Sequence, residues 1–171
     1  MNLRTLLYSF FWLLWVFLTL FFWSTYRYYE TVHADDPVQP ELFVTTWVSK
    51  IIRGPVTYEL SEKEEYTLED SDIIETGMDS NATITWPDKS LTRLGPKTRI
   101  TIEKMYASSN YDDIQIAYSL EQGKVWNTII RSLVWDSYFE VHLPRESIVA
   151  WVRGTTFEVN LENHYIRAIS H

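Results

Sequence analysis

The sequence predicts an all-β domain, a roll or sandwich of many short strands, behind one N-terminal transmembrane helix. Three observations support this prediction. An uncharged, strongly apolar run extends from Leu6 to Trp23. Beyond Leu42, apolar and polar residues alternate with period two, as expected of strands with one buried and one solvated face. Glycine, proline, aspartate or asparagine interrupts the alternation every eight to twelve residues, which is typical of the turns in an all-β fold.

The apolar run has the length of a membrane span. Its 18 residues would rise about 27 Å as an α-helix, close to the ~30 Å hydrocarbon core of a bilayer. Tyr26, Tyr28 and Tyr29 follow, where aromatic rings favour the headgroup layer. Leu6–Trp23 is therefore the expected membrane contact. The predicted order is a short cytoplasmic end at 1–5, a transmembrane signal anchor at 6–26, an extended stalk at 27–41 and a β domain at 42–171.

Charges beside the run predict its orientation. Arg4 and the α-amino group precede the run, whereas Arg27 and Glu30 follow it. The positive-inside rule then places the N-terminus in the cytoplasm and the β domain in the periplasm or outside the cell. A cleaved signal peptide is the alternative, because Val32-His33-Ala34 suits a signal peptidase. An uncleaved anchor is favoured, because the run exceeds the usual 7–15-residue core of a signal peptide.

Length and charge limit the classes of function. The roughly 135 residues after the anchor have room for one domain with one core. The whole chain has a net charge of −8, of which residues 1–34 contribute +1, so residues 35–171 carry −9. We expect no nucleic-acid binding from such an acidic domain. The absence of cysteine excludes disulfides, thiolate metal sites and cysteine nucleophiles. Nothing in the sequence indicates the oligomeric state.

The alternation predicts individual strands and their buried faces. Ala82, Ile84 and Trp86 share one face of their segment, and Ile100 and Ile102 share one face of another. The segment from Asn127 to Trp135 fits a short helical turn as well as a strand. The predicted strands are 43–52, 55–60, 73–76, 81–86, 91–94, 98–104, 113–121, 124–130, 137–143, 147–152, 155–161 and 164–170.

Three segments, in this order, resemble the FecR domain, named for the ferric-citrate signalling regulator. Residues 73–98 are similar to its Thr-Gly turn, Asp-Ser, alternating strand, hairpin turn, Arg-Leu and Pro-x-Thr. Residues 120–126 resemble Leu-x-x-Gly-x-Val-Trp, and residues 152–159 resemble Val-Arg-Gly-Thr-x-Phe-x-Val. The motif residues, interpreted as structural, are Gly77, Asp79, Ser80, Asp88, Ser90, Arg93, Leu94, Gly123, Trp126, Arg153, Gly154, Thr155 and Phe157.

The chain departs from the family pattern in three places. Lys89 stands where the hairpin turn usually has glycine, and left-handed geometry there would cost about 1 kcal/mol, so a wider or different turn is expected. The family usually continues beyond the last strand, whereas this chain stops at His171; a fragment or short variant is favoured over an open edge for β-augmentation. FecR-type transducers also have a cytoplasmic segment that engages a sigma factor, whereas only Met1 to Thr5 precede the run. Direct sigma-factor control is therefore not expected.

Arginine and tryptophan are the candidate ligand-binding residues. Arg153 lies beside a turn and is suited to a bidentate pair with a carboxylate, either as an internal clamp, which is favoured, or in a ligand. Trp126 and Trp151 are the other candidates, because stacked rings suit sugars, peptides or a flat protein face. Core packing is the favoured interpretation of the aromatic set as a whole. Its members are Trp47, Trp126, Trp135, Trp151, Tyr106, Tyr111, Tyr118 and Tyr138.

No catalytic residue is expected. Asp79 and Asp88 flank one predicted strand, and a pair of carboxylates can hydrolyse glycosides. However, Asp-Ser and Pro-Asp are ordinary turn sequences, and the resemblance implies no enzyme.

No metal and no cofactor are expected either. Asp70, Asp72 and Glu75 lack the glycine and the full spacing of an EF-hand loop. His142 and His164 do not have the spacing of helical metal ligands, although strands can bring distant residues together.

The sequence thus predicts a membrane-anchored, extracytoplasmic, non-catalytic binding module of the cell envelope, whose partner is an envelope protein or an envelope polymer such as a glycan. The alternative is a regulatory component of transmembrane signalling that acts through a partner crossing the same membrane.

Overall fold

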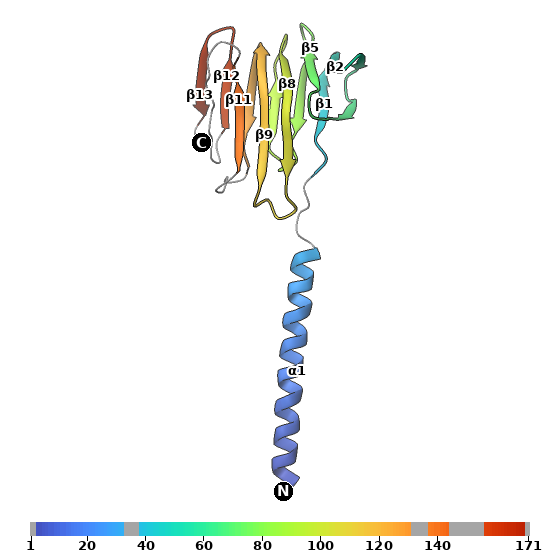
Figure 1. Ribbon diagram of the computed structural model, residues 1–171, viewed down its shortest axis with the longest axis vertical. Helices are drawn as coiled ribbons and strands as arrows, with labels where there is room; N and C mark the ends of the chain where they lie inside the picture. The colour runs from blue at the N-terminus through green and yellow to red at the C-terminus, as the bar shows by residue number, and fades with distance from the viewer. Residues whose placement is uncertain (1–2, 33–37, 131–136, 144–155, 170–171) are drawn as a thin grey trace. The chain divides into compact units, whose positions relative to one another are not determined.

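A computed structural model describes residues 3–32, 38–130, 137–143 and 156–169 of the chain (Figure 1). The chain forms two compact units, Met1–Asp35 and Asp36–His171. The first unit is helical and the second is built of strands.

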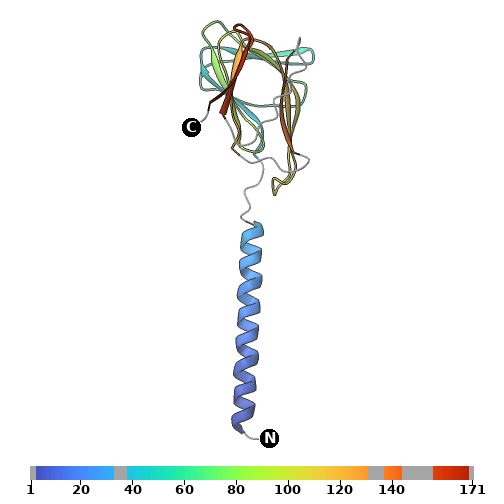
Figure 2. The ribbon, with the colours of Figure 1, turned by 90° about the vertical axis from the view of Figure 1, so that its left-hand side faces the viewer.

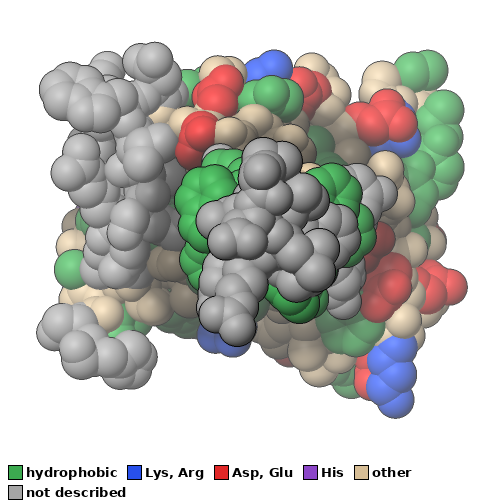
Figure 3. Space-filling model, turned by 90° about the horizontal axis from the view of Figure 1, so that it is seen from below, with side chains coloured by type: hydrophobic (Ala, Val, Ile, Leu, Met, Phe, Trp, Pro, Cys, Tyr) green, Lys and Arg blue, Asp and Glu red, His purple; other side chains and the backbone are tan. Residues whose placement is uncertain are grey.

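The first unit is the helix α1, Leu3–Val32. Residues 27–32 belong to it, so the prediction of an extended stalk is wrong there. No glycine or proline occurs before Pro37, and nothing local therefore stops the helix earlier. Large apolar side chains between Phe11 and Trp23 are exposed, on more than one side of the helix (Figure 3). Among the residues that the structure describes, no helix combines the length and apolarity of a membrane span.

The second unit consists of two β-sheets, which face each other in Figure 2, and the prediction of an all-β domain is confirmed. The seven-stranded sheet has the order β13-β12-β10-β7-β6-β1-β4, and the six-stranded sheet has the order β11-β9-β8-β5-β2-β3. The strands are β1 (Glu41–Thr46), β2 (Ser49–Arg53), β3 (Val56–Leu60), β4 (Glu65–Thr67), β5 (Ile73–Thr76), β6 (Asn81–Thr85), β7 (Leu91–Leu94), β8 (Arg99–Ala107), β9 (Ile114–Gln122), β10 (Lys124–Thr128), β11 (Tyr138–His142), β12 (Thr156–Asn160) and β13 (Tyr165–Ile169).

The core lies between the two sheets. Ala82, Ile84 and Trp86 are buried on one face of their segment, as predicted. The Trp86 ring stacks on Tyr118 of the opposite sheet with ring centroids 5.7 Å apart, and Phe139 packs edge-on against both rings. Stacked and edge-to-face arrangements are those that aromatic quadrupoles favour. This cluster joins β6, β9 and β11 across the sandwich.

Two strand predictions were wrong. The predicted strand 43–52 is divided into β1 and β2, because the chain leaves the seven-stranded sheet at Trp47, where φ is 60°. The short strand β4 was not predicted, because its three residues lie in an acidic segment without an apolar pattern. The ambiguous segment continues β10 to Thr128, and its residues 131–136 lie outside the described ranges, as does the predicted strand 147–152.

Four of the corners at which the chain crosses between the sheets are linked together by main-chain hydrogen bonds. These corners join β1 to β2, β5 to β6, β7 to β8 and β9 to β10. The Gly77 N–H donates to the Val48 carbonyl at 3.3 Å, and the Lys97 N–H donates to the Gly77 carbonyl at 3.0 Å. The Gly95 N–H donates to the Lys124 carbonyl at 3.0 Å. The corners therefore form one end of the sandwich.

Candidate functional site

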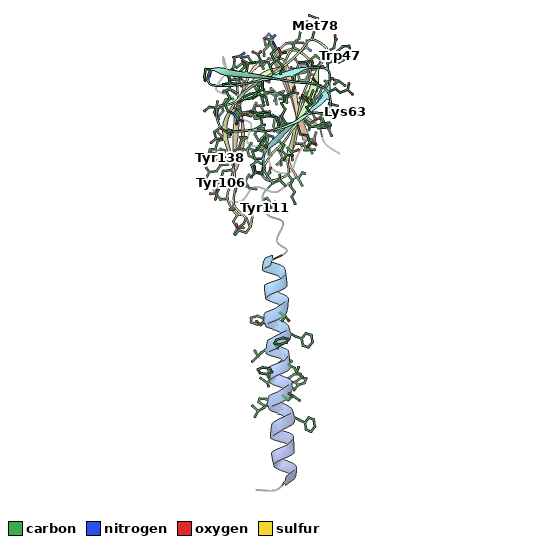
Figure 4. All side chains as sticks on the ribbon, turned by 90° about the vertical axis from the view of Figure 1, so that its right-hand side faces the viewer. Trp47, Lys63, Met78, Tyr106, Tyr111 and Tyr138 are labelled. Carbon is green, nitrogen blue, oxygen red and sulfur yellow. The ribbon has the colours of Figure 1, made fainter. Side chains whose placement is uncertain are left out.

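Exposed apolar side chains gather where the β1–β2 corner meets the β5–β6 corner. Trp47 is 67% exposed, Val48 44% and Met78 70%. Figure 4 shows Trp47 and Met78 at the same end of the β unit. We refer to these three residues as the apolar corner. Exposed apolar residues that cluster in this way mark interaction sites more often than residues scattered singly.

Hydrogen bonds fix the backbone of the apolar corner. The Val48 carbonyl accepts from the Ser80 hydroxyl at 2.5 Å, in addition to the Gly77 N–H. Thr46 Oγ1 accepts from the main-chain N–H and the side-chain amide of Asn81, each at 3.0 Å. These bonds hold Trp47 at positive φ, which costs a residue with a side chain about 1–2 kcal/mol. Strain of this kind occurs at functional sites, and in this chain it also occurs at the turn residue Lys89.

A second surface lies on the outer face of the seven-stranded sheet. Strand pairing aligns one residue from each strand in a row across it. We refer to these residues as the outer row. In spatial order they are Arg167, Glu158, Trp126, Arg93, Thr83, Phe43 and Glu65.

The middle of the outer row is positively charged. Lys124 Nζ lies 5.0 Å from the centre of the Trp126 ring, within the range of a cation–π interaction. Arg93 is exposed and makes no hydrogen bond or ion pair with any residue that the structure describes. Glu158 accepts from Arg167 at 2.8 Å and from the Tyr165 hydroxyl at 2.7 Å. That hydrogen bond raises the pKa of Tyr165. The carboxylate opposite Trp126, that of Glu158, therefore binds residues of β13 and not Arg93.

A buried polar network lies behind Trp126 on the inner face of the same sheet. Trp86 Nε1 donates to Thr92 Oγ1 at 2.7 Å, and the Thr92 hydroxyl donates to Asn127 Oδ1 at 2.6 Å. The Tyr118 hydroxyl donates to the same oxygen at 2.8 Å across the sandwich. Burial raises the pKa of Tyr118, so its hydroxyl stays protonated as a donor. The network fixes β10 to both sheets and so restrains the strand that presents Trp126.

Asp88 and Ser90, two of the predicted motif residues, stabilise the β6–β7 turn. Both are fully buried. The Asp88 carboxylate accepts from the Ser90 N–H at 3.0 Å and from the Ser90 hydroxyl at 2.6 Å. The Ser90 hydroxyl oxygen accepts from the Ile130 N–H at 3.2 Å. Lys89 takes a φ of 70°, so the expectation that another turn would avoid left-handed geometry at this lysine is wrong.

The carboxylates considered for catalysis do not meet. Asp79 is exposed in the β5–β6 corner, whereas Asp88 is buried in the turn after β6. The five residues of β6 lie between them, which corresponds to about 17 Å at ~3.3 Å per residue. Paired carboxylates of glycosidases stand about 5–9.5 Å apart.

Asp72 and His142, two of the candidate metal ligands, bind other side chains. Asp72 is fully buried, and Arg53 binds both of its oxygens, at 2.8 and 2.7 Å. These bonds raise the pKa of the Arg53 guanidinium. His142 lies between Glu103 at 2.7 Å and Glu140 at 3.1 Å on the six-stranded sheet. His164 lies beyond β12 of the other sheet, so the two histidines are not brought together.

Among the other motif residues, Leu94, Phe157 and Gly123 serve packing or backbone geometry. Leu94 and Phe157 lie in the core. Gly123 has a φ of 85°, and a Cβ there would stand 2.5 Å from Thr98 Oγ1, so this corner requires glycine. The predicted residues Trp151, Arg153, Gly154 and Thr155 lie outside the described ranges.

Some aromatic residues were misjudged from the sequence, Arg93 was given only a structural role and Lys124 was not named as a candidate. Tyr118 lies in the core, as predicted for the aromatic set, but Trp47 and Tyr106 are exposed. Tyr111, Tyr138 and Trp126 are half-buried, and Trp135 lies outside the described ranges. Arg93 and Lys124 were not predicted to act with Trp126. Lys124 and Trp126 are two residues apart in one strand and therefore lie on the same face, which could have been predicted from the sequence.

Comparison with known proteins gives one match. The family model described as FecR protein matches residues 72–169, which is more than half of the chain. No curated protein and no solved structure matches it.

Proposed function

Because this chain belongs to the FecR family, we propose that its β unit is a non-catalytic recognition module that binds an envelope protein outside the cytoplasm. The family match supports a role related to signalling and regulation. The apolar corner carries the proposal. Bulky, exposed and held in a strained conformation, Trp47 is the type of residue that dominates the binding energy of protein interfaces.

The proposal includes membrane anchoring through α1. The uncharged run Leu6–Trp23 and the exposed apolar side chains of α1 support it, because such side chains gain most of their stabilisation when lipid covers them. The flanking charges support an N-terminus in the cytoplasm. The chain has no cysteine, so a single Ser61→Cys places one thiol in the exposed segment between β3 and β4. Labelling of this thiol by an impermeant maleimide in intact cells is the expected result. Protection until lysis would reverse the orientation.

Photo-crosslinking tests the protein-binding proposal directly. A benzoylphenylalanine residue is introduced at Trp47, at Met78 or at Tyr106 of the full chain in its native membrane. Tyr106 is the matched control, because it is an exposed aromatic residue away from the apolar corner (Figure 4). We expect positions 47 and 78 to give an adduct with the same envelope protein and position 106 to give none. Equal adducts at all three positions, or no protein adduct at 47 and 78, would contradict the proposal.

A second function, transmembrane signalling through a partner, is favoured by the family match itself. The same crosslinks distinguish it, because an adduct with an outer receptor or with a sigma-factor regulator would identify a signalling component. An adduct with a structural envelope protein would identify an assembly role.

A further inference from the structure

We propose that the outer face of the seven-stranded sheet is a second recognition site, which binds an anionic polysaccharide through Trp126, Arg93 and Lys124. This site is separate from the apolar corner and uses different residues. It takes a polymer of sugar rings that carry carboxylates, such as a polyuronate.

Charge complementarity is the first argument. Residues 35–171 carry a net charge of −9, and most such surfaces repel polyanions. Arg93 is nevertheless exposed and has no acidic partner among the described residues, while Lys124 lies over the Trp126 ring. The nearest carboxylate in the outer row, Glu158, is neutralised by Arg167. Among the described residues, neither of the two cations beside the indole has an acidic partner.

The contrast with other arginines of the domain supports this assignment. Arg53 binds Asp72 and Glu69, and Arg99 binds Glu75 and Glu121. The other arginines that the structure describes in this domain, Arg53, Arg99 and Arg167, bind carboxylates. Arg93 lies directly opposite Trp126 without such a partner among the described residues, so its bidentate donor geometry is available for an anion.

The position of β10 selects the class of ligand. This strand pairs with β7 on one side and with β12 on the other, so its backbone is occupied and no peptide can extend the sheet here. Recognition must therefore use the side chains on the outer face of the sheet, of which Arg93 is exposed and Trp126 is half-buried. An indole offers a flat apolar surface to the C–H face of a sugar ring, while Arg93, Lys124 and Thr83 offer hydrogen bonds to its carboxylate and hydroxyl groups. The buried network at Asn127 restrains the strand behind them.

Calorimetry on the full chain in nanodiscs of neutral lipid tests the site. The probes are a galacturonic-acid oligosaccharide and a neutral glucose oligosaccharide of equal length. We expect the acidic oligosaccharide to bind at least about tenfold more tightly, and its affinity to fall as ionic strength rises. Arg93→Gln and Trp126→Ala should each weaken binding at least about fivefold.

Matched variants separate the site from general effects. Lys63→Gln removes an exposed cation and Tyr106→Asn removes an exposed aromatic ring, both away from Trp126 and Arg93, and both should leave the oligosaccharide affinity unchanged. Arg93 is exposed, so Arg93→Gln should keep its native circular dichroism and melting temperature, and it serves as the decisive variant if Trp126→Ala fails to fold. Failure of the acidic probe to bind, equal binding of both probes, or unchanged affinity in Arg93→Gln would overturn the proposal. Tighter binding of an acidic peptide that depends on Trp126 would also overturn it.

Discussion

The β6–β7 turn and the apolar corner both contain strained backbone, but they differ in whether the side chains around it are buried or exposed. Each places a residue other than glycine at positive φ, Lys89 in the turn and Trp47 in the corner. In the turn, a buried carboxylate and hydroxyl hold the chain, and they are packed under the end of β6. In the corner, polar groups hold the backbone while the apolar side chains remain exposed.

The difference separates strain that serves folding from strain that serves recognition. Asp88 and Ser90 satisfy each other and the Ile130 N–H, so the turn is complete within the chain. In the apolar corner only the backbone is held by hydrogen bonds, whereas the Trp47 and Met78 side chains remain 67% and 70% exposed. We therefore expect substitutions in the turn to change stability alone and substitutions in the corner to change binding.

The largest effect is expected from Asp88→Ala. The substitution leaves the buried Ser90 N–H and hydroxyl without their acceptor, and each unsatisfied buried group costs about 1–3 kcal/mol. The free energy of unfolding, measured by urea denaturation, should fall by about 3 kcal/mol. Asp79→Ala is the matched control, because Asp79 is an exposed turn aspartate, and it should change stability by less than about 0.5 kcal/mol. Equal losses in both variants would remove the distinction between the two regions.

Trp47→Asn should combine a gain in stability with a loss of binding. Asparagine tolerates left-handed backbone better than tryptophan, so the free energy of unfolding should rise by about 1 kcal/mol. Capture of the envelope protein through position 78 should be lost in this background. A loss of stability would show that the Trp47 side chain supports the fold rather than a partner.

Lys89→Gly should raise stability as Trp47→Asn does, but it should leave binding of the envelope protein unchanged. Glycine takes positive φ freely, and the unfolding free energy should rise by about 1 kcal/mol, less the entropy that glycine adds to the unfolded chain. Photo-crosslinking from position 47 should continue unchanged. A change in that crosslink would mean that the turn also contributes to recognition.

The smallest effect is expected near the end of β9, from Glu121→Gln. The Thr101 hydroxyl and Arg99 hydrogen-bond the Glu121 carboxylate and lower its pKa below the ordinary value of 4.5. A lowered folded-state pKa adds stability above the ordinary pKa, and this stability is lost as pH falls through the folded-state value. The Glu121 side chain is 37% exposed, so solvent screens the interaction and the effect should be under about 0.5 kcal/mol. Denaturation of the variant at neutral and acidic pH should show a shallower acid loss than the original chain; identical pH profiles would exclude this contribution.

Local patterns were sufficient to predict most strands, whereas contacts between distant segments were not predicted. The burial of Ala82, Ile84 and Trp86 follows from period two alone. The division of the strand 43–52 was not predictable, because the apolar alternation gives no sign that the chain changes sheets at Trp47. The candidate site was predicted only at Trp126. Its neighbour Arg93 joins it through the pairing of β7 with β10, which no local pattern specifies.

The path of β9, β10 and β11 has a consequence for how the domain folds. The chain passes from the six-stranded sheet to the seven-stranded sheet and back, and β11 then pairs in parallel with β9. Neither layer is therefore a continuous stretch of chain, and the parallel pair requires a crossover through the other layer. We expect the two layers to form in one cooperative step that depends on sequence-distant contacts and is slow for a chain of this length. Proteolytic cleavage at any of the four hydrogen-bonded corners should therefore destabilise both sheets, because each corner joins a strand of one sheet to a strand of the other.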